Sequence, residues 1–155
     1  MIRSHVLICG GTGCTSSKSV EIKNAMEAEL LAKGLADEVK VVLTGCFGLC
    51  ALGPIMIIYP EGTFYSNVKI EDAAEIVSEH LLKGRPVERL VYHEAKADVH
   101  HATSLSETAF YKKQKRVALR NCGVINPEEI EEYIAMDGYF ALGKVLTEMT
   151  PDDVI

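Results

Sequence analysis

The fold is decided by a stretch near the N-terminus, His5-Val6-Leu7-Ile8-Cys9-Gly10-Gly11-Thr12-Gly13-Cys14. It begins as a short apolar run and then breaks into glycines, which is typical of a buried strand that ends in a loop. Residues 18–33 follow, with apolar side chains at Ile22, Met26 and Leu30 on one face of a helix. Residues 39–43 are rich in β-branched side chains, so they are expected to form a second strand. The opening of the chain therefore predicts a β-α-β unit.

Two further strands and a second helix are predicted after this unit. Residues 55–59 and 63–65 have strand-like composition, and the turn Pro60-Glu61-Gly62 between them indicates a hairpin. Apolar side chains at helical spacing mark a helix over residues 70–81, which Gly84 and Pro86 stop. The order β-α-β-β-β-α over roughly 85 residues predicts an α/β fold on the thioredoxin-like plan.

The rest of the chain differs in composition. Residues 91–116 hold three of the five histidines and little apolar periodicity, which predicts a linker. Beyond it we expect a short strand at 117–119 and helices at about 127–136 and 139–149. Thr150 begins another helix signal close to the last residue. The chain is therefore expected to be a fragment, or the front part of a longer protein.

Composition excludes several classes of function. The chain has 155 residues, a net charge of −6 and 48% hydrophobic residues, which is ordinary globular composition and argues against a nucleic-acid partner. The only basic run, residues 112–116, is expected to be a solvated face. No apolar stretch reaches the roughly 18–20 residues that cross a bilayer, and no secretory signal is visible. A cytoplasmic location is expected, where thiols stay reduced, so the five cysteines indicate metal ligands or reactive thiols.

Four cysteines form two pairs at equivalent places in the predicted fold. Cys9 and Cys14 follow the first strand, and Cys46 and Cys50 follow the second. In a right-handed β-α-β unit the two strands are parallel, so both loops emerge at one edge of the sheet and the four thiols can converge. Four thiolates suit a zinc ion or an iron–sulfur cluster. The neighbouring glycines favour the cluster, because they let backbone N–H groups approach its sulfurs.

Other chemistry is less well supported by the residues. The Gly10-Gly11-Thr12-Gly13 loop lies where a dinucleotide-binding loop would, but Ser16 stands where that motif needs glycine. Cys-x-x-Cys is absent, so dithiol chemistry has weak support. Cys122 is expected to be a small buried thiol and not a ligand. No catalytic residue is indicated. A zinc-binding interaction module and a thioredoxin-like thiol oxidoreductase stay open as alternatives.

Cys-x4-Cys followed about 30 residues later by Cys-x3-Cys, on this element order, resembles the thioredoxin-like 2Fe–2S ferredoxins. The segment Gly45-Cys46-Phe47-Gly48-Leu49-Cys50, with Gly53-Pro54, is similar to the second cysteine loop of that family. The resemblance implies electron transfer through one 2Fe–2S cluster. We expect its ligands to be Cys9, Cys14, Cys46 and Cys50. One close pair is expected on each iron, because each pair can chelate.

A second resemblance concerns the part of the chain after the linker. It rests on Lys115-Arg116-Val117-Ala118-Leu119-Arg120-Asn121-Cys122-Gly123, Pro127-Glu128, Gly138-Tyr139 and Met149-Thr150-Pro151. These residues resemble the first part of the flavoprotein core in NADH dehydrogenases, most closely the diaphorase-type beta subunit of NAD(P)-linked, electron-bifurcating iron hydrogenases.

The second resemblance divides the chain into a ferredoxin domain (1–90), a linker (91–116) and the truncated start of a flavoprotein-type region (117–155). It implies that FMN, NAD(P)H and further iron–sulfur clusters bind only in a missing C-terminal part. The implied partners are other redox subunits of a hydrogenase or NADH dehydrogenase complex. The chain alone is expected to be an electron carrier that does not oxidise NAD(P)H.

Overall fold

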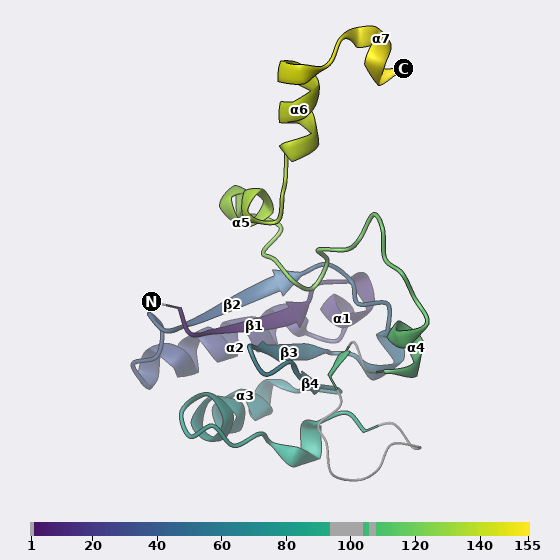
Figure 1. Ribbon diagram of the computed structural model, residues 1–155. Coiled ribbons are helices and arrows are strands. Elements are labelled where there is room, and N and C mark those ends of the chain that lie inside the picture. The colour runs from purple at the N-terminus through teal and green to yellow at the C-terminus, as the bar shows by residue number, and fades with distance from the viewer. Residues whose placement is uncertain (1, 94–103, 106–107) are drawn as a thin grey trace.

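A four-stranded sheet lies at the centre of the computed structural model, which describes residues 2–93, 104–105 and 108–155. Its strands are β1 (Ser4–Cys9), β2 (Val39–Thr44), β3 (Met56–Tyr59) and β4 (Thr63–Tyr65). The spatial order is β2-β1-β3-β4 (Figure 1). Strand β1 runs parallel to β2 and antiparallel to β3, and β3 and β4 form a hairpin. The four strands predicted in the first 65 residues, and the hairpin of the last two, are confirmed.

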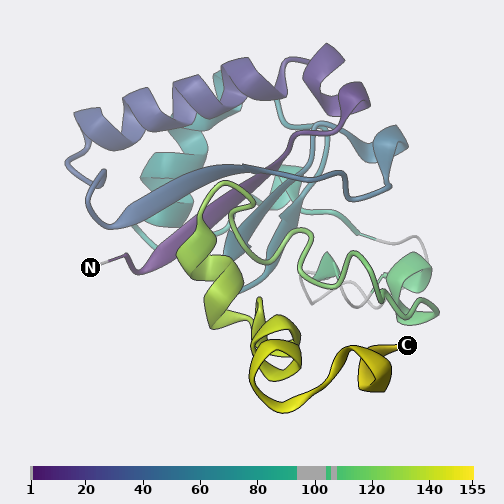
Figure 2. The same ribbon diagram turned by 90° about the horizontal axis from the view of Figure 1, so that it is seen from above.

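Helices cover one face of the sheet. The long helix α2 (Ser19–Ala32) and the helix around α3 lie side by side there (Figure 2). The second helix changes geometry along its length, from 3-10 in η2 (Ile70–Asp72) through α3 (Ala73–Glu75) to π in η3 (Ile76–Leu81). Alternate side chains of β1 and β3 pack against these helices. They form the main core with the buried side chains of Ile22, Met26, Leu30, Ile76 and Val77.

The opposite face of the sheet carries a second buried cluster. Leu7, Ile57 and Phe64 pack there with Phe47 and both cysteines of the first pair. Short 3-10 turns at η1 (Cys50–Leu52) and η4 (Glu88–Leu90) complete this part of the chain. No helix among the described residues is both long and apolar enough to cross a membrane.

Two residues of the predicted linker pair with strand β4 of the sheet. Val91 forms an antiparallel bridge with Tyr65, and Ser104 forms one with Thr63. Leu105 is buried, and α4 (Ala109–Lys112) follows it. Two of the linker histidines, at positions 100 and 101, lie outside the described residues.

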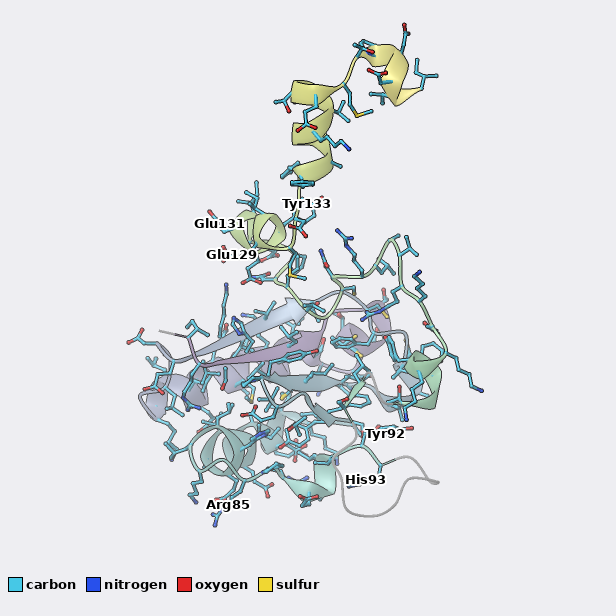
Figure 3. The ribbon with its side chains drawn as sticks, in the orientation of Figure 1. Arg85, Tyr92, His93, Glu129, Glu131 and Tyr133 are labelled. Carbon is cyan, nitrogen blue, oxygen red and sulfur yellow. The ribbon has the colours of Figure 1, made fainter. Side chains whose placement is uncertain are left out.

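The C-terminal segment is partly helical, with α5 (Ile130–Ala135), α6 (Phe140–Glu148) and α7 (Pro151–Val154). The strand predicted at 117–119 is wrong, because these residues form turns in which Val117 and Leu119 are exposed. Helix α5 begins three residues later than the proline that was expected to open it. Ion pairs of Glu129 and Glu132 with Lys40 hold it beside β2. Glu129 is labelled in Figure 3.

Candidate metal centre

The first cysteine pair is buried at the end of β1. Cys9 is the last residue of β1 and Cys14 lies in the short helix α1 (Thr12–Ser16), which the sequence did not predict. Both residues are 2% exposed. Backbone hydrogen bonds run from Cys9 N to Ile55 O (3.0 Å) and from Gly10 N to Thr44 O (2.9 Å). The second of these bonds holds the first loop against the end of β2, just before the second pair, and the first joins Cys9 to the residue that precedes β3.

The second pair lies on the exposed loop after β2. Cys46 and Cys50 are both exposed, and each lies against the backbone of the first loop. A methyl group at Gly11 would come within 2.9 Å of Sγ of Cys46, and one at Gly13 within 3.6 Å of Sγ of Cys50. Glycine is therefore needed at Gly11 for the two loops to approach this closely. The structure brings both loops together at the ends of the two parallel strands.

The two pairs lie in different electrostatic surroundings. Burial raises the pKa of the Cys14 thiol to about 11, and a hydrogen bond with Cys9 adds to the shift. Without a compensating cation the Cys14 thiol therefore holds its proton, whereas a bound metal would favour the thiolate. At the exposed loop, Gly48 N donates a hydrogen bond to Sγ of Cys46 at 3.3 Å. Such a bond to sulfur stabilises a thiolate ligand and tunes a metal centre.

The donor set fits a cluster that is shared between two irons. Among the described residues, no group of three or more His, Cys, Asp or Glu side chains surrounds one point as a single metal ion requires. A 2Fe–2S cluster makes a different demand, because its four thiolates are divided between two irons. The chain offers four thiols as two pairs on neighbouring loops, one pair buried and one exposed, which is the type and number of ligands that such a cluster needs.

Cys122 lies beside the second loop, although sequence reasoning placed it outside the site. Its Sγ is 3.6 Å from the carbonyl oxygen of Cys46, and it touches Gly45. Tyr111 reaches the same loop, where its hydroxyl donates a hydrogen bond to Phe47 O. These contacts join residues more than 60 positions apart. No local pattern in the sequence signals them.

Comparisons with known proteins agree with this geometry. The sequence profile of the family described as "Thioredoxin-like [2Fe-2S] ferredoxin" matches residues 2–81. A 2Fe–2S ferredoxin of Clostridium pasteurianum is 48% identical over 96 residues, which is 57% of this chain and 94% of that ferredoxin. The crystal structure of the thioredoxin-like [2Fe-2S] ferredoxin from Aquifex aeolicus is 34% identical, with a TM-score of 0.55. The match covers 61% of this chain and all of that one.

A longer protein is also similar. Subunit HndC of an NADP-reducing hydrogenase from Solidesulfovibrio fructosivorans is 55% identical over 51 residues, which is 33% of this chain and 10% of that subunit. The matches as a set confirm the predicted thioredoxin-like fold and the predicted 2Fe–2S cofactor. The chain belongs to the thioredoxin-like [2Fe–2S] ferredoxin family.

Proposed function

We propose that the chain transfers single electrons through one 2Fe–2S cluster ligated by Cys9, Cys14, Cys46 and Cys50. The observation that carries this proposal is the meeting of the two cysteine loops at the ends of β1 and β2. Cys9 and Cys14 would hold one iron and Cys46 and Cys50 the other. When bound, the cluster supplies a one-electron redox couple.

The protein's own residues decide which side of the site is accessible. Cys9 and Cys14 lie in the second buried cluster, whereas Cys46 and Cys50 face solvent. A redox partner can therefore approach closest at the second loop. We assign that loop as the place where electrons arrive and leave. The buried pair shields the other side of the site from water.

We also propose that the chain is the N-terminal portion of an NAD(P)H-linked flavoprotein subunit of the hydrogenase or NADH dehydrogenase type. The similarity to HndC and the motifs between residues 115 and 151 support this proposal. FMN, NAD(P)H and further clusters would then bind in a longer protein, with other redox subunits as partners. A cytoplasmic location fits the five unbridged cysteines of the chain.

Visible absorption separates the leading proposal from its alternatives. The protein reconstituted with iron and sulfide under reducing conditions is expected to be coloured and to bleach on reduction by dithionite. A zinc-binding module would stay colourless under every condition. A thioredoxin-like oxidoreductase would reduce disulfides catalytically without metal. A colourless protein that binds stoichiometric zinc in preference to iron would overturn the proposal.

A further inference from the structure

Residues 108–123, called the strap below, cross the second cysteine loop. Three of its residues make hydrogen bonds to residues 44–47, which run from the end of β2 into this loop. Tyr111 donates its hydroxyl proton to Phe47 O, and Gly123 N donates to Oγ1 of Thr44 at 3.1 Å. The thiol of Cys122 points to the Cys46 carbonyl oxygen at 3.6 Å. The strap is therefore fixed to the same loop that presents the exposed cysteine pair.

Arg116 ties the two ends of the strap together. Its Nη1 donates a 2.8 Å hydrogen bond to Cys122 O, and its guanidinium carbon lies 5.1 Å from the centre of the Tyr111 ring. Arg116 is the last residue of the basic run that was expected to be solvated, yet it is half-buried while the lysines before it are exposed. Within the described part of the chain, it forms no ion pair with an acidic side chain.

These contacts hold a positive charge, which has no ion-pair partner among the described residues, close to the second loop. Cys122, which accepts the hydrogen bond from Arg116, itself contacts both Gly45 and Cys46. A guanidinium is charged at every accessible pH, so this charge does not depend on conditions. Because the side chain is partly withdrawn from water, its field is screened less than that of an exposed lysine.

We propose that the strap positions the charge of Arg116 beside the Cys46–Cys50 loop in order to raise the reduction potential of the cluster. This inference rests on the proposed function. Reduction adds one electron, and therefore one negative charge, to a site that already holds four thiolates. No bond forms or breaks. A fixed positive charge stabilises the reduced form more than the oxidised form, so it favours acceptance of the electron.

The test is a redox titration of the reconstituted 155-residue protein, with dithionite as reductant and visible absorption as readout. At a fixed ambient potential, Arg116→Gln is expected to lower the ratio of reduced to oxidised protein about threefold. At 59 mV per tenfold for a one-electron couple, this equals a fall of about 30 mV in midpoint potential. Arg116→Lys keeps the charge and should stay near the wild-type potential. Lys115→Gln removes a neighbouring, exposed charge and serves as the matched control.

Two results would overturn the proposal. Equal falls in Arg116→Gln and Arg116→Lys would show that packing, and not charge, sets the potential. If Arg116→Gln and Lys115→Gln have the same midpoint potential, the charge of Arg116 does not act on the cluster more than that of an exposed lysine. If Arg116→Gln fails to take up cluster, Asn121→Asp replaces it as the test. That variant adds a negative charge next to Cys122 and should also lower the potential, and an unchanged potential there sinks the proposal. A wild-type protein that binds no cluster would instead refute the proposed function.

Discussion

The hydroxyl oxygen of Tyr65 lies 2.7 Å from Nδ1 of His80, in the core between β4 and the π-helical segment η3. The same hydroxyl accepts a hydrogen bond from Val87 N at 2.9 Å, so its own proton is available for the histidine. Nδ1 then acts as an acceptor, which requires a neutral imidazole. Burial lowers the pKa of His80, in agreement with that arrangement.

We therefore expect the protein to lose stability as pH falls below the ordinary histidine pKa of about 6.5. The folded pKa is the lower one, so in the window between the two values the unfolded chain binds more protons. The free energy of unfolding accordingly rises with pH across this window and is lost as pH falls through it. Urea unfolding of the metal-free protein in reductant, followed by circular dichroism, measures the effect without interference from acid-labile cluster.

Two histidine variants separate this effect from general acid denaturation. His80→Gln can still accept the Tyr65 proton but does not titrate, so the loss between about pH 7 and pH 5 should shrink. His93→Gln changes an exposed histidine and should leave the pH dependence as it is. An identical pH dependence in wild type and His80→Gln would contradict the assignment.

The roles of the five cysteines give a second prediction. Cys46→Ala and Cys50→Ala each remove one of four proposed ligands and should abolish stoichiometric cluster. Cys122→Ala removes a thiol that points to a backbone carbonyl, and should keep full iron and acid-labile sulfide. Metal and sulfide analysis after anaerobic reconstitution measures the difference. A loss in Cys122→Ala as large as in the other two would mean that the ligand set is wrong.

Sequence reasoning reached the sheet and both cysteine loops because their signals are local. The strand β1 is a short apolar run that ends at Gly10, and Ile22, Met26 and Leu30 recur at helical spacing, so both signals are visible without the fold. The strand predicted at 117–119 failed for the opposite reason. Val117, Ala118 and Leu119 form an apolar run like that of a strand, but they lie in turns and pair with no strand within the described structure.

The strap escaped prediction because its contacts depend on tertiary packing. Gly123 and Arg116 carry no periodic signal. Gly123 N bonds to Thr44, 79 positions away, and the partners of Arg116, although they lie within the strap, are brought to it only by the path that the strap takes over the second cysteine loop. The basic run was therefore interpreted as a solvated face, which holds for Lys115 but not for the half-buried Arg116.

Close approach of the two cysteine loops gives a third prediction. In Gly11→Ala the new methyl group would lie 2.9 Å from both Cβ and Sγ of Cys46, so one loop must move. We expect cluster assembly to fall strongly, because the displaced group is a proposed ligand. Gly143→Ala in α6 is the matched control, since a methyl group there meets nothing within 4 Å. It should leave cluster content unchanged and stabilise that helix by about 0.5–1 kcal/mol.

Iron content per chain, measured after identical reconstitution, compares the two glycine variants. A Gly11→Ala protein that assembles as much cluster as Gly143→Ala would show that the loops can separate without cost. The close contact between Gly11 and Cys46 would then play no part in holding the ligands.

The last prediction is that the 155-residue chain does not oxidise NADH. A nucleotide site needs a glycine-rich loop whose backbone N–H groups are free to bind phosphates. Here Gly10 N already donates to Thr44 O at 2.9 Å, and Cys46 and Cys50 lie against Gly11 and Gly13, where a phosphate would have to bind. Reduction of a dye by NADH should therefore stay at the rate measured without protein. The same dye should be reduced by protein that dithionite has already reduced, which shows that the electron-transfer site is intact. Protein-dependent turnover of NADH would place a nucleotide site within these residues and contradict the proposed need for a longer flavoprotein.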